Sequence, residues 1–132
     1  MYYNAKAIIV RPDRFILETC PQGFDLNEFI KNKHGAIVNI GSIASDATPP
    51  TKLTGYVLAK NAVHSLTKSL SVEYGHYGIR LNTVSPGMTD TTMIAEVPEK
   101  TRLITAMHTP LRRLGRTEDI AQAISFLLSD GA

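Results

Sequence analysis

The sequence predicts an α/β protein with a small, mainly parallel sheet and flanking helices. Two short apolar runs, residues 36–40 and 79–84, each follow a glycine and are typical of buried strands. Between them, residues 56–74 place apolar side chains at helical spacing. A strand, a long helix and a second strand in this order predict parallel pairing of the two strands through a right-handed crossover.

The N-terminal segment predicts a hairpin of unclear origin. "AKAIIV" (5–10) is rich in β-branched residues, "PDR" is typical of a turn, and "FILET" (15–19) is typical of a second strand. Residues 24–34 predict a short helix that a glycine terminates. We therefore expect residues 1–24 to form a hairpin segment that is separate from the unit formed by residues 25–132.

The C-terminal part predicts two further helices. Residues 85–100 predict a long loop with one helical turn, and a helix is expected near residues 98–108. Residues 116–130 predict a strongly amphipathic helix. We expect Thr117 to cap this last helix, and the two acidic residues after it to favour the positive end of the helix dipole.

Composition and charge exclude several classes of protein. The 132 residues are 43% apolar and 20% charged, which is typical of one globular domain and not of a disordered chain. A net charge of +2 is too small for a nucleic-acid-binding surface, so no nucleic acid is expected as a partner. No apolar run approaches the roughly 18 residues of a membrane-spanning helix, and no signal peptide is visible, so we expect no membrane association.

The numbers and spacing of the cysteine and histidine residues limit which disulfides and metal sites are possible. The single cysteine, Cys20, excludes an internal disulfide, so we expect a reducing compartment and a cytoplasmic location. The four histidines lack the spacing of metal ligands, so we expect no metal site and place each histidine at the surface or at a cap. They are His34, His64, His76 and His108.

Tyr56 and Lys60 are candidate catalytic residues on the helix predicted for residues 56–74. Residues four apart on a helix are neighbours on one face, so the phenol and the ammonium are expected to lie close together. A nearby ammonium favours the ionised form of a phenol, and a tyrosine tuned in this way can exchange a proton with an alcohol oxygen. The same spacing is typical of an ordinary amphipathic helix, so the pair alone leaves both interpretations open.

Ser42 lies just beyond the first central strand, at the carboxyl end where α/β sheets bind their ligands. A hydroxyl at this position can hold a substrate oxygen beside Tyr56. The ordinary alternative is a serine that caps a turn, and Ser45 and several threonines in the same loop keep that alternative open.

The loop at residues 85–91, "SPGMTDT", follows the second central strand, again at a carboxyl end. Pro86 and Gly87 predict a tight turn with exposed backbone, and Thr89 and Thr91 supply hydroxyl groups. Such a loop can hold an amide or a phosphate of a ligand, or can simply connect two elements.

Four blocks of sequence carry a more specific signal. They are "HGAIVNIGS" (34–42), "YVLAK" (56–60), "LSVEYGHYGIRLNTVSPGMTDT" (70–91) and "PLRRLGRTEDIAQAISFLLSD" (110–130). In order and spacing they resemble the short-chain dehydrogenase/reductase family, and in particular its classical members that act on alcohols and ketones, including 3-oxoacyl carrier protein reductases. The resemblance implies a partial Rossmann-like fold and hydride transfer between NAD or NADP and a small-molecule alcohol or ketone.

The resemblance also implies a role for each candidate residue. Tyr56 is similar to the family's catalytic acid/base, Lys60 to the residue that tunes it and binds the nicotinamide ribose, and Ser42 to the hydroxyl that stabilises the reacting oxygen. The cofactor-binding positions at the ends of the two strands correspond to Asn39, Pro86, Gly87, Thr89 and Thr91.

Some features of the family are missing from this sequence. Complete members begin with a βαβ unit whose glycine-rich turn places the cofactor pyrophosphate at a helix N-terminus, and no G-x-x-x-G-x-G occurs here before the resemblance begins. The family's catalytic asparagine would fall near Phe15, where nothing matches, and members continue past the last helix into another strand. The resemblance therefore implies a family member truncated at both ends.

Two functions are compatible with these observations. The first is an NAD(P)-dependent oxidoreductase of short-chain type that needs a cofactor-binding half, supplied for example by a complementing chain. The second is a catalytically silent remnant that acts in oligomerisation or partner binding. In the family the helix that carries the tyrosine and lysine packs against its copy in a neighbouring subunit, so we expect a homo-oligomer through the helix at residues 55–75.

Overall fold

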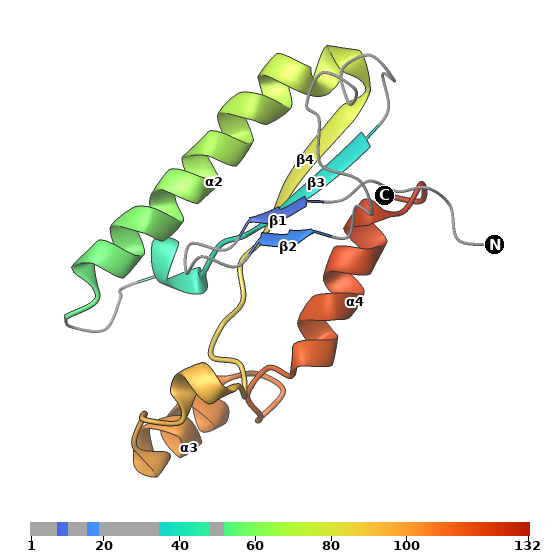
Figure 1. The fold of residues 1–132 in the computed structure, drawn as a ribbon. Helices are drawn as coiled ribbons and strands as arrows, with labels where there is room; N and C mark the ends of the chain where they lie inside the picture. The colour runs from blue at the N-terminus through green and yellow to red at the C-terminus, as the bar shows by residue number, and fades with distance from the viewer. Residues whose placement is uncertain (1–7, 11–15, 19–34, 48–51) are drawn as a thin grey trace.

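The computed structural model describes residues 8–10, 16–18, 35–47 and 52–132 (Figure 1). Its elements in chain order are β1 (Ile8–Val10), β2 (Ile16–Glu18), β3 (Gly35–Ile40), the 3₁₀ turn η1 (Ile43–Ser45), α2 (Thr54–Tyr74), the 3₁₀ turn η2 (Gly75–Tyr77), β4 (Ile79–Val84), the 3₁₀ turn η3 (Thr92–Ile94), α3 (Glu99–His108) and α4 (Thr117–Leu128). The helix predicted for residues 24–34 lies outside the described residues.

The strands β3 and β4 form a two-stranded parallel sheet, as the order of apolar segments predicts. Their register runs from Gly35 opposite Ile79 to Ile40 opposite Val84. The connection between them is α2, and both α2 and α4 pack against the two strands. Figure 1 shows α2 on one side of the sheet and α4 on the other, so the α/β fold class is confirmed.

The core lies between the sheet and α2. Ile79 and Leu81 of β4 are buried there, packed against Ile37 of β3 and against Leu70 and Tyr74 of α2. Side chains alternate between the two faces of a strand. Val38, next to Ile37 in β3, therefore faces the opposite side of the sheet, and it is fully buried.

The predicted N-terminal hairpin is confirmed. β1 and β2 pair antiparallel, with Ile8 opposite Glu18 and Val10 opposite Ile16. The pair forms a sheet of its own, and β1 lies against β3. The hairpin thus borders the β3 side of the parallel sheet.

The end of α2 and the start of α4 show how local sequence sets helix boundaries. After α2 and η2, Gly78 adopts a left-handed φ of 73°, a conformation that glycine reaches without strain. The expectation that Thr117 caps α4 is wrong, because the residue with extended backbone before the helix is Arg116. The backbone N–H of Arg116 donates to the Asp119 carboxylate at 2.8 Å, which satisfies one of the exposed donors at the helix start.

Arg80 of β4 fixes the other end of α4. Its guanidinium donates to the backbone carbonyls of Leu127 at 2.7 Å and Ser129 at 2.8 Å. The last carbonyls of a helix lack partners within the helix, so a cation at this position satisfies them and complements the helix dipole. No helix in the described part of the chain is long and apolar enough to cross a membrane.

Candidate active site

The carboxyl ends of β3 and β4 bring two loops together. The backbone N–H of Gly41 donates to the carbonyl of Val84 at 2.8 Å, and that of Ile43 donates to the carbonyl of Pro86 at 3.1 Å. The loop that carries Ser42 therefore lies directly beside the turn that carries Pro86. This is the edge of a parallel sheet at which ligands bind.

Gly41 makes this close approach possible. A Cβ atom added at Gly41 would lie 2.7 Å from Oγ of Ser85 and 2.8 Å from Cγ2 of Thr83. These distances are shorter than real Cβ contacts, so the side chains of Ser85 and Thr83 would have to move to admit any larger residue.

Lys60 links α2 to the end of β3. The Lys60 side chain is buried, with 6% exposed, and its Nζ donates to the backbone carbonyl of Ile40 at 2.9 Å. The same Nζ lies 5.6 Å from the ring centroid of Tyr56, so the pair is adjacent, as the helical spacing predicts. Tyr56 itself is 39% exposed.

Ser42 is buried two residues beyond the strand end. Its Oγ accepts a hydrogen bond from the backbone N–H of Ala44 at 3.2 Å, which makes Ser42 the N-cap of η1. The structure therefore shows Ser42 in the capping role that the sequence left open. A hydroxyl that accepts one hydrogen bond still carries its own proton, so capping and donation to a substrate oxygen are compatible.

Asn39 lies against α2. Its Nδ2 donates to Oγ1 of Thr67 at 2.8 Å, and that hydroxyl donates to the carbonyl of Val63 at 2.8 Å. Asn39 and Thr67 are both buried. Thr67 was not among the residues predicted from the sequence, although its position seven residues after Lys60 places it two turns further along the same helix face.

The threonines of the loop after β4 hydrogen-bond within that loop. Oγ1 of Thr89 donates to the carbonyl of Gly87 at 3.1 Å, and Oγ1 of Thr91 approaches the carbonyl of Thr89 at 3.4 Å. None of the contacts described for these two hydroxyls joins them to Tyr56, Lys60 or Ser42. A Cβ added at Gly87 would meet nothing within 4 Å, so the backbone there is open to a ligand.

A second anchor for this loop comes from the segment before α4. The backbone N–H of Asp90 donates to the carbonyl of Gly115 at 2.8 Å, and that of Gly115 donates to the carbonyl of Met88 at 3.0 Å. Thr89 and Gly115 thereby form an isolated parallel bridge. The loop after β4 is held on both sides, by η1 and by residue 115.

The segment around Gly115 is fixed in turn by an ion pair. Arg113 donates to both carboxylate oxygens of Asp119, at 2.5 and 3.0 Å. The hydrogen bond from Arg113, followed by the one from the Arg116 backbone, lowers the pKa of Asp119 to about 2. From the sequence, Asp119 was expected only to favour the helix dipole, because the sequence carries no local signal for this bidentate pair.

Comparison with known proteins agrees with this architecture. A family model described as enoyl-(acyl carrier protein) reductase matches residues 25–132. Among curated proteins, cis-4-hydroxycyclohexanecarboxylate dehydrogenase from Sinomonas cyclohexanicum is 44% identical over 98 residues, which cover 74% of this chain and 39% of the relative. The 3-oxoacyl-[acyl-carrier-protein] reductase FabG from Pseudomonas aeruginosa is 40% identical over 107 residues, which cover 81% of this chain and 43% of the relative.

Solved structures give the same result. A 3-oxoacyl-[acyl-carrier protein] reductase from Brucella melitensis superposes with a TM-score of 0.74 at 31% identity, over 80% of this chain and 39% of that one. The structure of ElxO with NADP bound superposes with a TM-score of 0.70 at 33% identity, over 80% of this chain and 43% of that one. The chain belongs to the short-chain dehydrogenase/reductase family. It spans about two fifths of the length of these relatives.

Proposed function

We propose that this chain forms the catalytic part of an NAD(P)-dependent oxidoreductase of short-chain type, which interconverts a small alcohol and its ketone. The observation that carries the proposal is the position of Lys60. A buried ammonium is costly unless it is hydrogen-bonded, and here it lies between the carbonyl at the end of β3 and the ring of Tyr56. That arrangement is suited to orienting a phenol at the ligand-binding edge of the sheet.

Each of the three catalytic candidates has a distinct task in this proposal. Tyr56 transfers the proton, taking it from the substrate hydroxyl in oxidation and returning it to the carbonyl oxygen in reduction. Lys60 holds its ammonium beside the ring of Tyr56 and orients the phenol toward the substrate oxygen. Ser42 donates a hydrogen bond to the same substrate oxygen as charge develops on it.

The cofactor would lie at the same edge of the sheet. When bound, a nicotinamide cofactor supplies or accepts the hydride at the substrate carbon. Lys60 is the candidate for its ribose, and the open backbone at Gly87, with Pro86, is the candidate for the nicotinamide end. Related structures carry NAD in one case and NADP in another, so either nucleotide suits this class of site.

The other cofactor positions differ in how they contribute. Thr89 and Thr91 offer hydroxyl oxygens on the loop that Gly115 anchors. Asn39 acts through Thr67, because their hydrogen bond holds α2 in register with β3.

The described residues fit the nicotinamide end of the cofactor. For the pyrophosphate we propose a complementing, glycine-rich half, which the sequence here does not contain.

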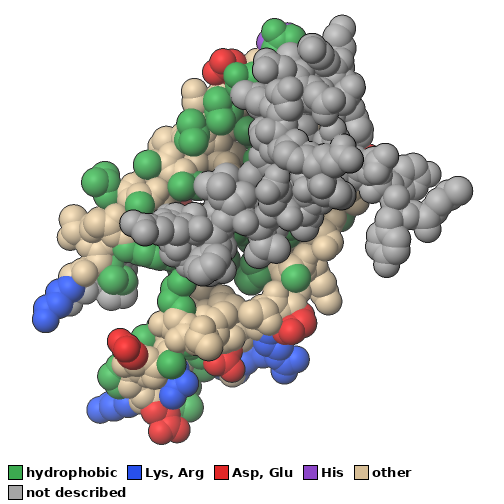
Figure 2. Space-filling view, viewed as in Figure 1, with side chains coloured by type: hydrophobic (Ala, Val, Ile, Leu, Met, Phe, Trp, Pro, Cys, Tyr) green, Lys and Arg blue, Asp and Glu red, His purple; other side chains and the backbone are tan. Residues whose placement is uncertain are grey.

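The chain is also proposed to self-associate through α2. Leu58, Leu66 and Val72 are exposed by 71%, 53% and 84%, and their helical positions fall on the side away from the sheet. Figure 2 shows hydrophobic side chains along this helix. Packing two copies of α2 against each other would remove this apolar surface from water.

The test is a titration with NADH, and separately with NADPH, followed by the fluorescence of the nucleotide. The chain has no tryptophan, so its own emission does not interfere. We expect saturable binding that Lys60→Ala weakens at least about tenfold, equivalent to about 1.4 kcal/mol. Lys52→Ala removes the same charge from an exposed position and is expected to leave binding unchanged.

Two further outcomes separate the alternatives. Circular dichroism of Lys60→Ala must match the parent chain, so that lost binding is not lost folding. If the parent chain binds neither nucleotide at millimolar concentration, alone or with a glycine-rich half from a relative, the oxidoreductase proposal is wrong for this chain. The alternative hypothesis, a catalytically silent family remnant that acts in oligomerisation, then remains.

A further inference from the structure

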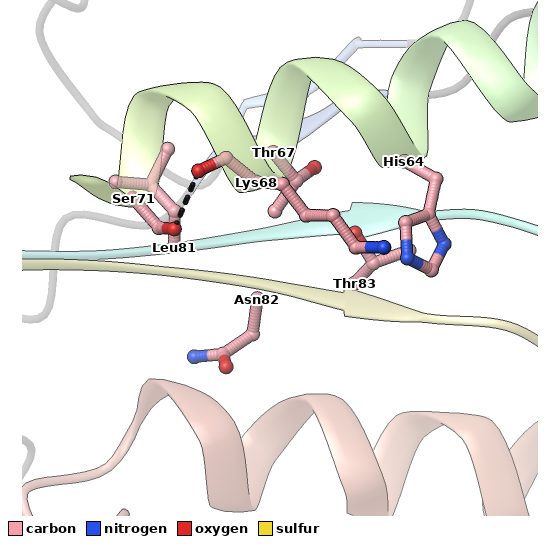
Figure 3. Close-up of a pocket in the computed structure, with 7 residues that line it drawn as sticks. All are labelled: His64, Thr67, Lys68, Ser71, Leu81, Asn82 and Thr83. Carbon is pink, nitrogen blue, oxygen red and sulfur yellow. Dashed lines mark hydrogen bonds between the residues drawn. The ribbon is translucent and has the colours of Figure 1, made fainter. Parts of the chain in front are cut away.

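A cavity beside β4 has no part in the proposed reaction. It lies between α2 and β4, has a volume of about 190 Å³ and is lined by His64, Thr67, Lys68, Ser71, Leu81, Asn82 and Thr83 (Figure 3). One water molecule needs on the order of 10–15 Å³ of such space, so the cavity has room for a group of several heavy atoms.

Two polar atoms in this cavity lack partners. Nδ1 of His64 and Oγ1 of Thr83 are both buried from solvent, and neither has a hydrogen-bond partner. Leaving a buried polar atom unpaired costs about 1–3 kcal/mol, so two such atoms in one cavity point to an absent ligand. His64 as a residue is only half-buried, but its Nδ1 faces inward.

The neighbouring polar groups in the cavity differ, because they already have partners. Oγ1 of Thr67 accepts from Asn39 and donates to the carbonyl of Val63, and Oγ of Ser71 donates to the carbonyl of Lys68 at 2.8 Å. The unpaired His64 and Thr83 atoms therefore do not reflect a general lack of partners around α2.

The charge of the cavity indicates what it binds. Lys68 follows His64 by one helical turn, and in Figure 3 its side chain extends toward His64 and Thr83. No acidic residue occurs among the described residues that line the cavity. An ammonium, a hydroxyl and an imidazole on the α2 side of β4 together offer several donors and a positive charge, which suits an oxyanion.

We propose that this cavity binds a small oxyanion of the phosphate type, held by His64, Lys68 and Thr83. Lys68 supplies the charge, and the Thr83 hydroxyl and the His64 imidazole supply hydrogen bonds that are otherwise unmade. The site is separate from the nicotinamide site, because Lys60 is directed to the carbonyl of Ile40 and lines no part of the cavity.

The experiment is a titration of the full chain with inorganic phosphate at constant ionic strength, followed by NMR of the histidine side chains. We expect a saturable shift of the His64 resonance with a dissociation constant on the order of 1 mM. Assignment comes from His64→Gln, and the resonances of His76 and His108 are expected not to move. Sodium chloride at equal ionic strength is expected to produce no saturable shift.

Matched variants separate a built site from general attraction. Thr83→Val keeps the side-chain shape without the hydroxyl, and Lys68→Met keeps the length without the charge. Each is expected to weaken phosphate binding at least about fivefold. Lys100→Met, which removes a charge from the exposed surface of α3, is expected to leave it unchanged. An equal response of all three variants, or no saturable shift in the parent chain, overturns the proposal. The readout uses no nucleotide, so it is independent of the oxidoreductase proposal.

Discussion

The Asn39 amide and the Thr67 hydroxyl form a buried hydrogen bond of 2.8 Å between residues that are 28 positions apart in the sequence. It joins β3 to α2 one strand position before Ile40, whose carbonyl accepts from Lys60. The geometry of the candidate site therefore depends on a contact between β3 and α2 that lies beside the Lys60 anchor.

Thr67→Val is expected to lower the free energy of unfolding by about 1–3 kcal/mol. The substitution keeps the side-chain shape but leaves the buried Nδ2 of Asn39 without its acceptor. Chemical denaturation measures the effect. Thr105→Val is the control, because its hydroxyl makes a similar bond to the carbonyl of Thr101 on an exposed helix face, and a change within about 0.5 kcal/mol is expected there. Equal effects of the two variants would contradict this account of Asn39.

Gly41→Ala is expected to destabilise the fold by about 1–3 kcal/mol, because the new methyl group would overlap Ser85 and Thr83. Gly55→Ala is the matched control in α2. A Cβ there meets nothing within 4 Å, so the substitution is expected to raise stability by about 0.4–1 kcal/mol. Thermal unfolding of the two variants and of the parent chain gives the comparison, and a neutral Gly41→Ala would show that the two loops can separate freely.

Stability at acid pH is expected to depend on Asp119. Its pKa in the folded chain is about 2, below the usual value for an aspartate, so its contribution is present above about pH 4 and is lost as the pH falls toward 2. Asp119→Asn removes this contribution at neutral pH. The free energy of unfolding of this variant is therefore expected to fall less between pH 5 and pH 2 than that of the parent chain. Urea denaturation at each pH measures both values. Asp90→Asn, at an exposed loop position, is expected to retain the parent profile.

Leu58→Asp is expected to shift the chain toward the monomer, because it places a charge in the apolar face of α2 proposed to pair with a second copy. Light scattering after size-exclusion chromatography measures the mass. Leu103→Asp on α3 is the control, since Leu103 is 58% exposed on a different element. A monomeric parent chain, or an equal response to both substitutions, would exclude α2 as the interface.

The sequence predicted the elements of the described fold well, because each carries a local signal. The two central strands are short apolar runs after glycines, and α2 has a helical repeat of apolar residues over its whole length. The adjacency of Tyr56 and Lys60 also follows from local spacing alone.

The parts that could not be predicted depend on contacts between distant residues. The partner of Arg80 is the end of a helix 47 and 49 positions further along the chain. The close approach at Gly41 arises because two loops meet, and no feature of either loop alone indicates it. Thr117 fits the statistical preference for a capping residue, yet the backbone turns helical one residue earlier than that prediction needs, so Thr117 is the first helical residue and Arg116 is the cap.

The pairing of β3 with β4 also has a consequence for how the chain folds. Gly35 lies opposite Ile79, a separation of 44 positions, so the sheet forms only after a long segment has closed on itself. The 21 residues of α2 lie within that segment and can become helical on the order of 0.1–1 μs, far faster than non-local strands usually pair. A preformed α2 shortens the span that must be closed, and its buried threonine is then in place to receive Asn39. Docking of the two strands onto this helix is therefore expected to limit the folding rate, and until it occurs the open edges of β3 and β4 are available to other chains.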